Sequence, residues 1–130
     1  MGVIMVLVVD DDPAVLKVTG AVLRRGGLGV LTATNGEQAL RIIEAGDPVV
    51  DLVLSDVCMP KMPGTELVRR IRKTVPSIRV ALMSGEVGPE VIEPGVPFLR
   101  KPFLPSTLIA KIRELLSDQN AAPEVRENRS

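Results

Sequence analysis

The sequence predicts an α/β fold in which a doubly wound, five-stranded parallel sheet carries helices on both faces. Apolar segments of strand length alternate along the chain with segments of helical periodicity, and that alternation is typical of such sheets. At 130 residues, the chain has the length of a single domain that buries roughly two-thirds of its unfolded surface. We expect this domain over residues 1–118 and a disordered polar tail over residues 119–130, where periodicity is lost.

Five apolar runs are assigned to the strands. They cover residues 4–9, 30–33, 52–55, 79–83 and 98–99. The first run is apolar throughout, and the third holds one serine in four residues, as expected of strands that are buried on both faces.

The first helix is expected to begin at Pro13, because a residue without an N–H group suits the first helical turn. Val15, Val18 and Val22 then recur at helical spacing, and a Gly-Gly pair at positions 26–27 ends the helix. Asp12 is either a metal ligand or the N-cap of this helix, and its place directly before the proline favours the cap.

Three further helices follow from the same periodicity. The second comes after an expected turn at Asn35-Gly36 and ends at Gly46; the third lies around residues 67–73 and the last around residues 108–116. Between the fourth and fifth strands, Gly85–Pro97 contains repeated glycines and prolines. A helix in that position is therefore predicted to be shortened or missing.

Composition excludes several functions. The chain contains no histidine, which removes histidine acid–base catalysis, histidine metal sites and a histidine phosphoacceptor. Sixteen basic residues balance sixteen acidic ones and aromatics make up 2%, so no surface for direct nucleic-acid binding is expected. The single cysteine, Cys58, cannot form an internal disulfide. With no targeting or membrane-spanning segment in view, we expect a cytoplasmic protein that does not enter the membrane.

Polar residues follow the strands where each one ends. Asp10 and Asp11 follow the first strand, Asp56 the third, Ser84 the fourth, and Lys101 the fifth. The carboxyl ends of parallel strands lie at one edge of a sheet, where binding sites form. Because clustered carboxylates repel one another, the site calls for a divalent cation and gains from a lysine. The pattern predicts a divalent-cation site that handles phosphate.

The same residues lie in motifs that resemble the receiver domain of two-component response regulators. The motifs are Val8–Pro13, Asp56–Gly64, Met83–Gly85 and Lys101–Phe103. The resemblance covers about residues 3–117 and implies a flavodoxin-like strand order of 2-1-3-4-5.

The resemblance also implies a role for each acidic position. Asp56 is the nucleophile that accepts a phosphoryl group from a phosphohistidine, and it also ligates the metal. Asp11 is a direct Mg²⁺ ligand, Asp10 acts on the ion through water, and Cys58 supplies its backbone carbonyl. Mg²⁺ prefers oxygen ligands of this kind.

Three further residues receive roles from the resemblance. Ser84 hydrogen-bonds one phosphoryl oxygen and Lys101 pairs with another, so both join Asp56 in the reaction. Ser84 and Phe98 form the switch, with Phe98 standing where many members of the family have Tyr. In typical receivers the fourth helix, the fifth strand and the last helix form the output face. A missing fourth helix therefore predicts either that a surface other than the usual helix-four face reports phosphorylation or that the domain mainly stores and relays phosphate.

The sequence thus predicts a regulatory phosphoacceptor that catalyses only its own phosphorylation and dephosphorylation. Its partners are a histidine kinase or phosphotransfer protein and a downstream protein that the sequence does not identify, and the domain is a monomer or weak dimer. One alternative is a Mg²⁺-dependent aspartyl-phosphate phosphohydrolase, although Cys58 stands where such enzymes usually place a second aspartate. Others are a receiver module of a hybrid histidine kinase and an interaction protein that has lost phosphorylation.

Overall fold

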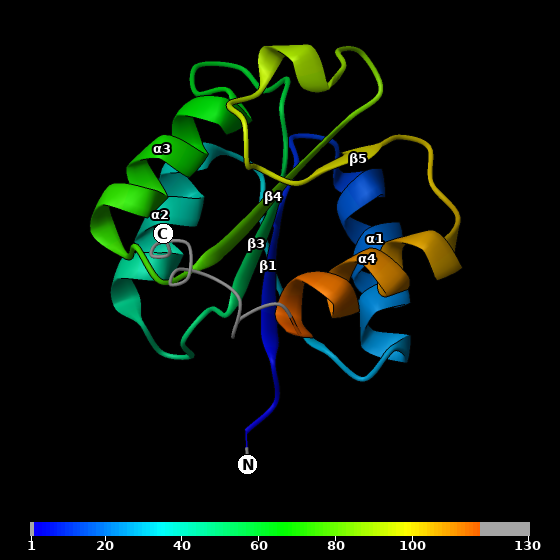
Figure 1. Cartoon of the computed structure of the whole chain (residues 1–130). Coiled ribbons are helices and arrows are strands. Elements are labelled where there is room, and N and C mark those ends of the chain that lie inside the picture. The colour runs from blue at the N-terminus through cyan, green and yellow to red at the C-terminus, as the bar shows by residue number, and fades with distance from the viewer. Residues whose placement is uncertain (1, 118–130) are drawn as a thin grey trace, which may run out of the picture.

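The structure is a computed structural model that describes residues 2–117, and it shows one parallel sheet between two pairs of helices (Figure 1). The expected tail at residues 119–130 lies outside this part of the chain. The sheet has the order β2-β1-β3-β4-β5, so the predicted fold class is confirmed. The elements are β1 (Met5–Val9), α1 (Pro13–Arg25), β2 (Gly29–Ala33), α2 (Gly36–Ala45), β3 (Leu52–Asp56), α3 (Gly64–Thr74), β4 (Arg79–Ser84), η1 (Pro89–Val91), β5 (Phe98–Arg100) and α4 (Pro105–Ser117).

The helices bury both faces of the sheet in two aliphatic layers. On one face, α2 and α3 pack on the strands through residues such as Ile43, Leu67 and Ile71. On the other face, α1 and α4 do so through residues such as Leu23 and Ile112. Figure 1 shows the two helix pairs on opposite sides of the sheet. This double covering explains why the strands read as continuous apolar runs.

Side-chain caps fix where two of the helices begin. The Asp12 carboxylate accepts the N–H of Ala14 at 2.9 Å, so the predicted N-cap of α1 is confirmed. The Asn35 side chain accepts the N–H of Gln38 at 2.8 Å and caps α2. The Asn35-Gly36 pair is therefore a helix start instead of the expected turn, because its side-chain oxygen satisfies a backbone N–H that the first helical turn leaves free.

The strand register aligns the polar residues at one edge of the sheet. Val9 pairs with Ser55, and Asp56 pairs with Met83. Ser84 in turn pairs with Arg100 at the end of β5. The residues that follow or end these strands are thus brought to the same carboxyl edge, as the sequence predicts.

The segment between β4 and β5 contains only η1, a 3₁₀-helix of three residues. Gly95 has a φ of 91°, a conformation that only glycine adopts readily and that no helix contains. Ile92, Val87 and Val96 still contact the core on the α2–α3 face. The predicted loss of the fourth helix is confirmed.

Within residues 2–117 we find no helix with the length and apolar character needed to cross a bilayer.

A close backbone contact positions the end of β3. The N–H of Gly64 donates to the carbonyl of Val57 at 2.8 Å. A Cβ atom on Gly64 would lie 2.1 Å from the backbone oxygen of Asp56, which is inside any allowed contact. Only glycine fits where α3 begins against the end of β3.

A Gly64→Ala substitution should therefore lower the free energy of unfolding by about 1–3 kcal/mol, the cost typical of an overpacked core. Urea unfolding followed by circular dichroism measures this change. Gly85→Ala is the matched control, because its Cβ would meet nothing nearer than 3.4 Å. Equal losses in the two variants would contradict the assigned contact.

Candidate functional site

Three carboxylates meet at the carboxyl edge of the sheet. Asp10 and Asp11 follow β1, Asp56 ends β3, and one oxygen from each lies within 4.8 Å of the others. Asp10 and Asp56 are 1% and 6% exposed, whereas Asp11 is open to solvent. The sequence predicted this cluster, and the structure brings its three members together.

The Lys101 ammonium joins two of these carboxylates. Its Nζ lies 2.8 Å from Asp10 Oδ2 and 3.1 Å from Asp56 Oδ1. Lys101 follows β5 and its peptide bond to Pro102 is cis. Two mostly buried carboxylates therefore share one partly buried ammonium. Their attraction to it offsets the free-energy cost of removing the two carboxylates from water.

The surroundings change the proton affinity of both partners. Burial raises the pKa of the Asp56 carboxyl, and the charges of Asp10 and Asp11 act in the same direction against the opposing effect of Lys101. Burial by itself would lower the pKa of Lys101, but its hydrogen bonds to Asp10 and Asp56 raise that pKa overall. The lysine is thus held in its charged form.

Both carboxylate oxygens of Asp10 accept hydrogen bonds. Oδ2 pairs with Lys101, and Oδ1 accepts the N–H of Asp12 at 2.9 Å. Asp11 and the second oxygen of Asp56 have no such partners among the interactions of residues 2–117. The cluster therefore presents Asp11 and Asp56 most directly to an incoming cation.

Ser84 ends β4 and is 1% exposed. Its Oγ accepts the N–H groups of Glu86 and Val87 at 3.0 and 3.1 Å. Because both of these bonds use the oxygen as an acceptor, the hydroxyl proton can be donated, and the Cys58 side chain is a hydrogen-bond partner near by. Ser84 therefore fixes the start of the segment that leads to η1.

Cys58 is half-buried, and Glu86, Ser84 and Asp56 are close enough to act on its thiol. The Glu86 carboxylate is the main cause that raises the pKa of the Cys58 thiol, and burial adds to the effect. A thiol with a raised pKa stays protonated and unreactive at neutral pH. The sequence did not lead us to expect Glu86 beside the Cys58 thiol. Its position two residues after Ser84 was the only feature of the sequence that could have indicated this.

Phe98 lies apart from the carboxylates, at the outer edge of the sheet. It is half-buried against the α2–α3 core, and the Arg100 guanidinium lies 5.7 Å from the centre of its ring. This cation–π contact stabilises the outward side of β5. The structure thus gathers Asp10, Asp11 and Asp56 within 4.8 Å of one another, and Lys101 pairs with Asp10 and Asp56. Ser84 ends the neighbouring β4, and Phe98 packs on the α2–α3 core.

Taken together, the site offers oxygen donors for a hard cation and an ammonium for an anion. Mg²⁺ takes carboxylate and carbonyl oxygens as ligands. An ammonium held between carboxylates is placed to pair with an oxyanion bound in the same crevice. Such a site suits the transfer of a phosphoryl group, which needs positioning and charge neutralisation more than acid–base chemistry.

Comparison with known proteins gives a consistent result. Residues 6–113 match the response regulator receiver domain family. Sensor kinase CckA of Brucella abortus (strain 2308) is 36% identical over 121 residues, a match that spans 88% of this chain and 13% of that protein. The chain spans between 13% and 48% of the length of the curated relatives compared with it.

Solved structures are similar over nearly their whole length. A CheY-like response regulator receiver domain protein from Methanospirillum hungatei JF-1 superposes with a TM-score of 0.84 at 31% identity, covering 92% of this chain and 98% of that one. The receiver domain of the hybrid histidine kinase CckA gives a TM-score of 0.75 at 37% identity, covering 86% of this chain and 98% of that one.

The raised pKa of Asp56 makes stability depend on pH. A carboxyl whose pKa is higher in the folded state than its ordinary value of 3.8 binds its proton more tightly there than in the unfolded chain. Its favourable contribution is present below the unfolded pKa and is lost as the pH rises through the folded pKa. An Asp56→Asn variant should therefore be more stable than the parent protein near neutral pH, and its advantage should shrink as the pH approaches 3.8.

Urea unfolding in a buffer free of divalent cations measures this difference at several pH values. Asp47→Asn is the control, because Asp47 is exposed in a loop away from the cluster. A variant at Asp56 that is less stable than the parent near neutral pH would overturn the assigned direction of the shift.

Proposed function

Because the chain belongs to the response regulator receiver domain family of two-component systems, we propose that it is a phosphoaccepting signalling module whose acceptor is Asp56. The observation that carries the proposal is the Lys101 ammonium at 2.8 and 3.1 Å from the carboxylates of Asp10 and Asp56. That arrangement supports an acceptor carboxylate beside a fixed cation. The fold is that of a regulatory phosphoacceptor, not of a conventional enzyme.

Asp56 acts as the nucleophile in this proposal. One of its carboxylate oxygens forms a bond to phosphorus while the bond between phosphorus and the donor nitrogen breaks, and the electron pair of that bond leaves with the donor. The donor is a phosphohistidine of a histidine kinase or phosphotransfer protein, since this chain contains no histidine. The position of Asp56 at the end of a wholly buried β3 keeps its carboxylate fixed for in-line attack.

The donor set of the crevice fits Mg²⁺. Asp11 and Asp56 would hold the ion directly with the backbone carbonyl of Cys58, and Asp10 would act through water because both of its oxygens already accept hydrogen bonds. When bound, the ion supplies positive charge that neutralises the phosphoryl oxygens. The close approach of three carboxylates within 4.8 Å supports this assignment.

Lys101 and Ser84 complete the proposed site. The Lys101 ammonium, which is held charged by its two carboxylate partners, pairs with a phosphoryl oxygen once the group is attached. Ser84 donates its hydroxyl proton to another phosphoryl oxygen, and Phe98 serves as the partner of Ser84 in the switch. Movement of Ser84 toward the phosphoryl group would loosen its bonds to Glu86 and Val87, so the segment around η1 changes with phosphorylation.

A phosphohydrolase is the alternative that the site supports less well. Its acid–base group would stand two residues after the nucleophile, where this chain has Cys58. The raised pKa of that thiol leaves it a poor base near neutral pH. Slow hydrolysis of the aspartyl phosphate, not turnover of small phosphate esters, is the expected second step.

We also propose the kind of protein in which this module works. Its relatives include a sensor kinase and transcriptional regulators, so it works either as a regulator or as the receiver module of a hybrid kinase. Phosphorylation changes its contacts with a downstream protein, and the domain itself is a monomer or weak dimer. A single free cysteine supports a cytoplasmic location.

Incubation with acetyl phosphate and Mg²⁺ should add the mass of one phosphoryl group to the intact protein. Asp56→Asn should abolish the adduct, because it removes the nucleophilic oxygen, while Asp47→Asn in an exposed loop should leave it unchanged. Intact-protein mass spectrometry follows both. An adduct that persists in the Asp56 variant, or rapid release of phosphate without an adduct, would contradict the proposal.

Asp11→Asn should weaken Mg²⁺ binding by at least about tenfold, a loss that even outer partners of a metal ion can cause. The neighbouring Asp12→Asn is a matched control, because asparagine keeps the side-chain cap of α1. Titration of Mg²⁺ by calorimetry or NMR gives the two affinities. Unchanged affinity in the Asp11 variant would exclude that residue as a ligand.

A further inference from the structure

Exposed aliphatic side chains gather at the amino edge of the sheet, the edge opposite to Asp56. Val3 and Ile4 precede β1 and are 64% and 43% exposed, and Val49 precedes β3 and is 67% exposed. In Figure 1 this edge lies at the bottom of the sheet, next to the N-terminus. Single exposed aliphatic residues are common on protein surfaces, but a group of them at one place is typical of an interaction site.

A groove connects this edge with the core. It has a volume of about 300 Å³ and lies where β1, β3 and β4 begin and α4 ends. Its apolar lining consists of Ile4, Val49, Val50, Val75, Ile78 and Leu116. Val50 and Ile78 are buried members of the aliphatic layer under α2 and α3, so the end of that layer opens into the groove. An apolar side chain of a second molecule would lose its contact with water there, which is favourable.

Two residues of opposite charge, Asp51 and Arg79, also line the groove. They lie on neighbouring strands, but their side chains diverge. Asp51 Oδ2 accepts the N–H of Met5 at 2.8 Å, whereas Arg79 Nε donates to the carbonyl of Leu115 on α4 at 2.9 Å. Neither side chain takes part in an ion pair within residues 2–117. The groove therefore carries one anion toward β1 and one cation toward α4.

We propose that two copies of this chain associate through the amino edge, with their exposed aliphatic residues packed together. A two-fold symmetric dimer uses the same surface patch twice, so the patch must complement itself. An apolar centre with one anion and one cation meets that requirement, because Asp51 faces Arg79 of the partner subunit and the reciprocal contact forms as well. A strongly acidic or strongly basic partner would instead set a like charge against one of the two residues.

This mode of association leaves both candidate phosphoryl sites open. Asp56 ends β3, whereas Val49 precedes the beginning of the same strand, so the two acidic clusters point away from each other in the dimer. The segment that contains η1 also lies outside the contact. The dimer thus goes beyond the proposed function: it carries two acceptor sites in one assembly, and its formation does not depend on phosphorylation.

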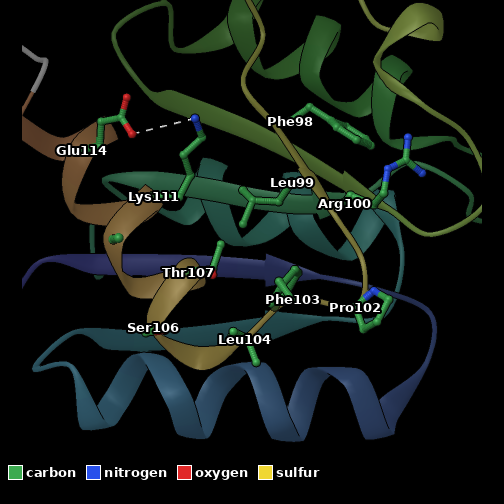
Figure 2. A pocket seen from close by; sticks show the side chains of 11 residues that line it. Phe98, Leu99, Arg100, Pro102, Phe103, Leu104, Ser106, Thr107, Lys111 and Glu114 are labelled. Carbon is green, nitrogen blue, oxygen red and sulfur yellow. Dashed lines mark ion pairs between the residues drawn. The ribbon is translucent and has the colours of Figure 1, made fainter.

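The groove between β5 and α4 is the alternative surface for self-association (Figure 2). Leu104 lines it and is 68% exposed. Figure 2 shows Lys111 of this groove paired with Glu114, at 3.9 Å, and Arg100 lies over the ring of Phe98. These charged side chains have partners within the same molecule, so their arrangement does not favour a second copy.

Sedimentation equilibrium of the whole protein, at concentrations up to about 1 mM, measures the association. The parent protein should form a reversible dimer with a dissociation constant above about 1 µM, because interfaces that reach this affinity usually bury more surface than a few aliphatic residues offer. Val49→Asp should weaken the dimer by at least about tenfold, since it places charges in an apolar contact. Val18→Asp on α1 and Leu104→Asp are matched controls at similarly exposed positions and should leave the constant unchanged.

Two charge reversals test the pairing itself. Asp51→Arg and Arg79→Asp should each weaken self-association by about threefold or more, because each sets like charges against each other across the two-fold axis. An equimolar mixture of the two variants should restore the dimer, since both contacts of the mixed dimer again join opposite charges. Circular dichroism of each variant shows that it is folded.

A parent protein that stays monomeric over this range would overturn the proposal. A dimer that survives Val49→Asp, a dimer that Val18→Asp or Leu104→Asp dissociates, or a mixture of the charge variants that stays monomeric would do the same. Acetyl phosphate with Mg²⁺ should leave the dissociation constant unchanged, and a dimer that forms only after this reaction would place the contact elsewhere. If the dimer is absent and the Asp56 adduct forms, only this proposal fails; if the dimer forms without an adduct, only the proposed function fails.

Discussion

The structure depends on one partly buried cation that two carboxylates share. Asp10 and Asp56 are almost fully buried, and their negative charges repel each other. The Lys101 ammonium between them compensates for this repulsion. Each of these residues comes from a different strand, so the interaction also connects β1, β3 and β5 at the carboxyl edge of the sheet. A fold that placed any of the three strands in another register would leave a charge buried without a partner, which is strongly unfavourable. The candidate chemistry therefore rests on a contact that offsets part of the cost of burying the Asp56 charge.

Most of this arrangement could be predicted from the sequence because its signals are local or follow from the topology. Apolar runs marked the strands, Pro13 and Asp12 marked the start of α1, and parallel strands necessarily bring their ends to one edge. The sequence could not show that Asn35 caps a helix instead of forming a turn, since the same residue type serves both purposes. Nor could it show that both oxygens of Asp10 are already bonded, or that Glu86 lies beside the Cys58 thiol. Those facts depend on side-chain directions in three dimensions.

Between β4 and β5, the short 3₁₀-helix η1 stands where a regular α/β pattern would have a full helix. This irregular segment lies next to the candidate site. Ser84 bonds the backbone of Glu86 and Val87, so the short segment with η1 is attached to a residue of the crevice. The same short segment contains no full helix between β4 and β5.

A double-mutant cycle tests most directly whether the shared cation organises the molecule. The free energy of unfolding would be measured for the parent protein, Asp56→Asn, Lys101→Met and the combined variant. If Lys101 and Asp56 interact as described, the two effects will be non-additive, with a coupling energy of about 0.5–3 kcal/mol, as found for residues in one ionic network. Additive effects, with no coupling beyond experimental error, would show that the ammonium does not stabilise the acceptor carboxylate and would contradict the account.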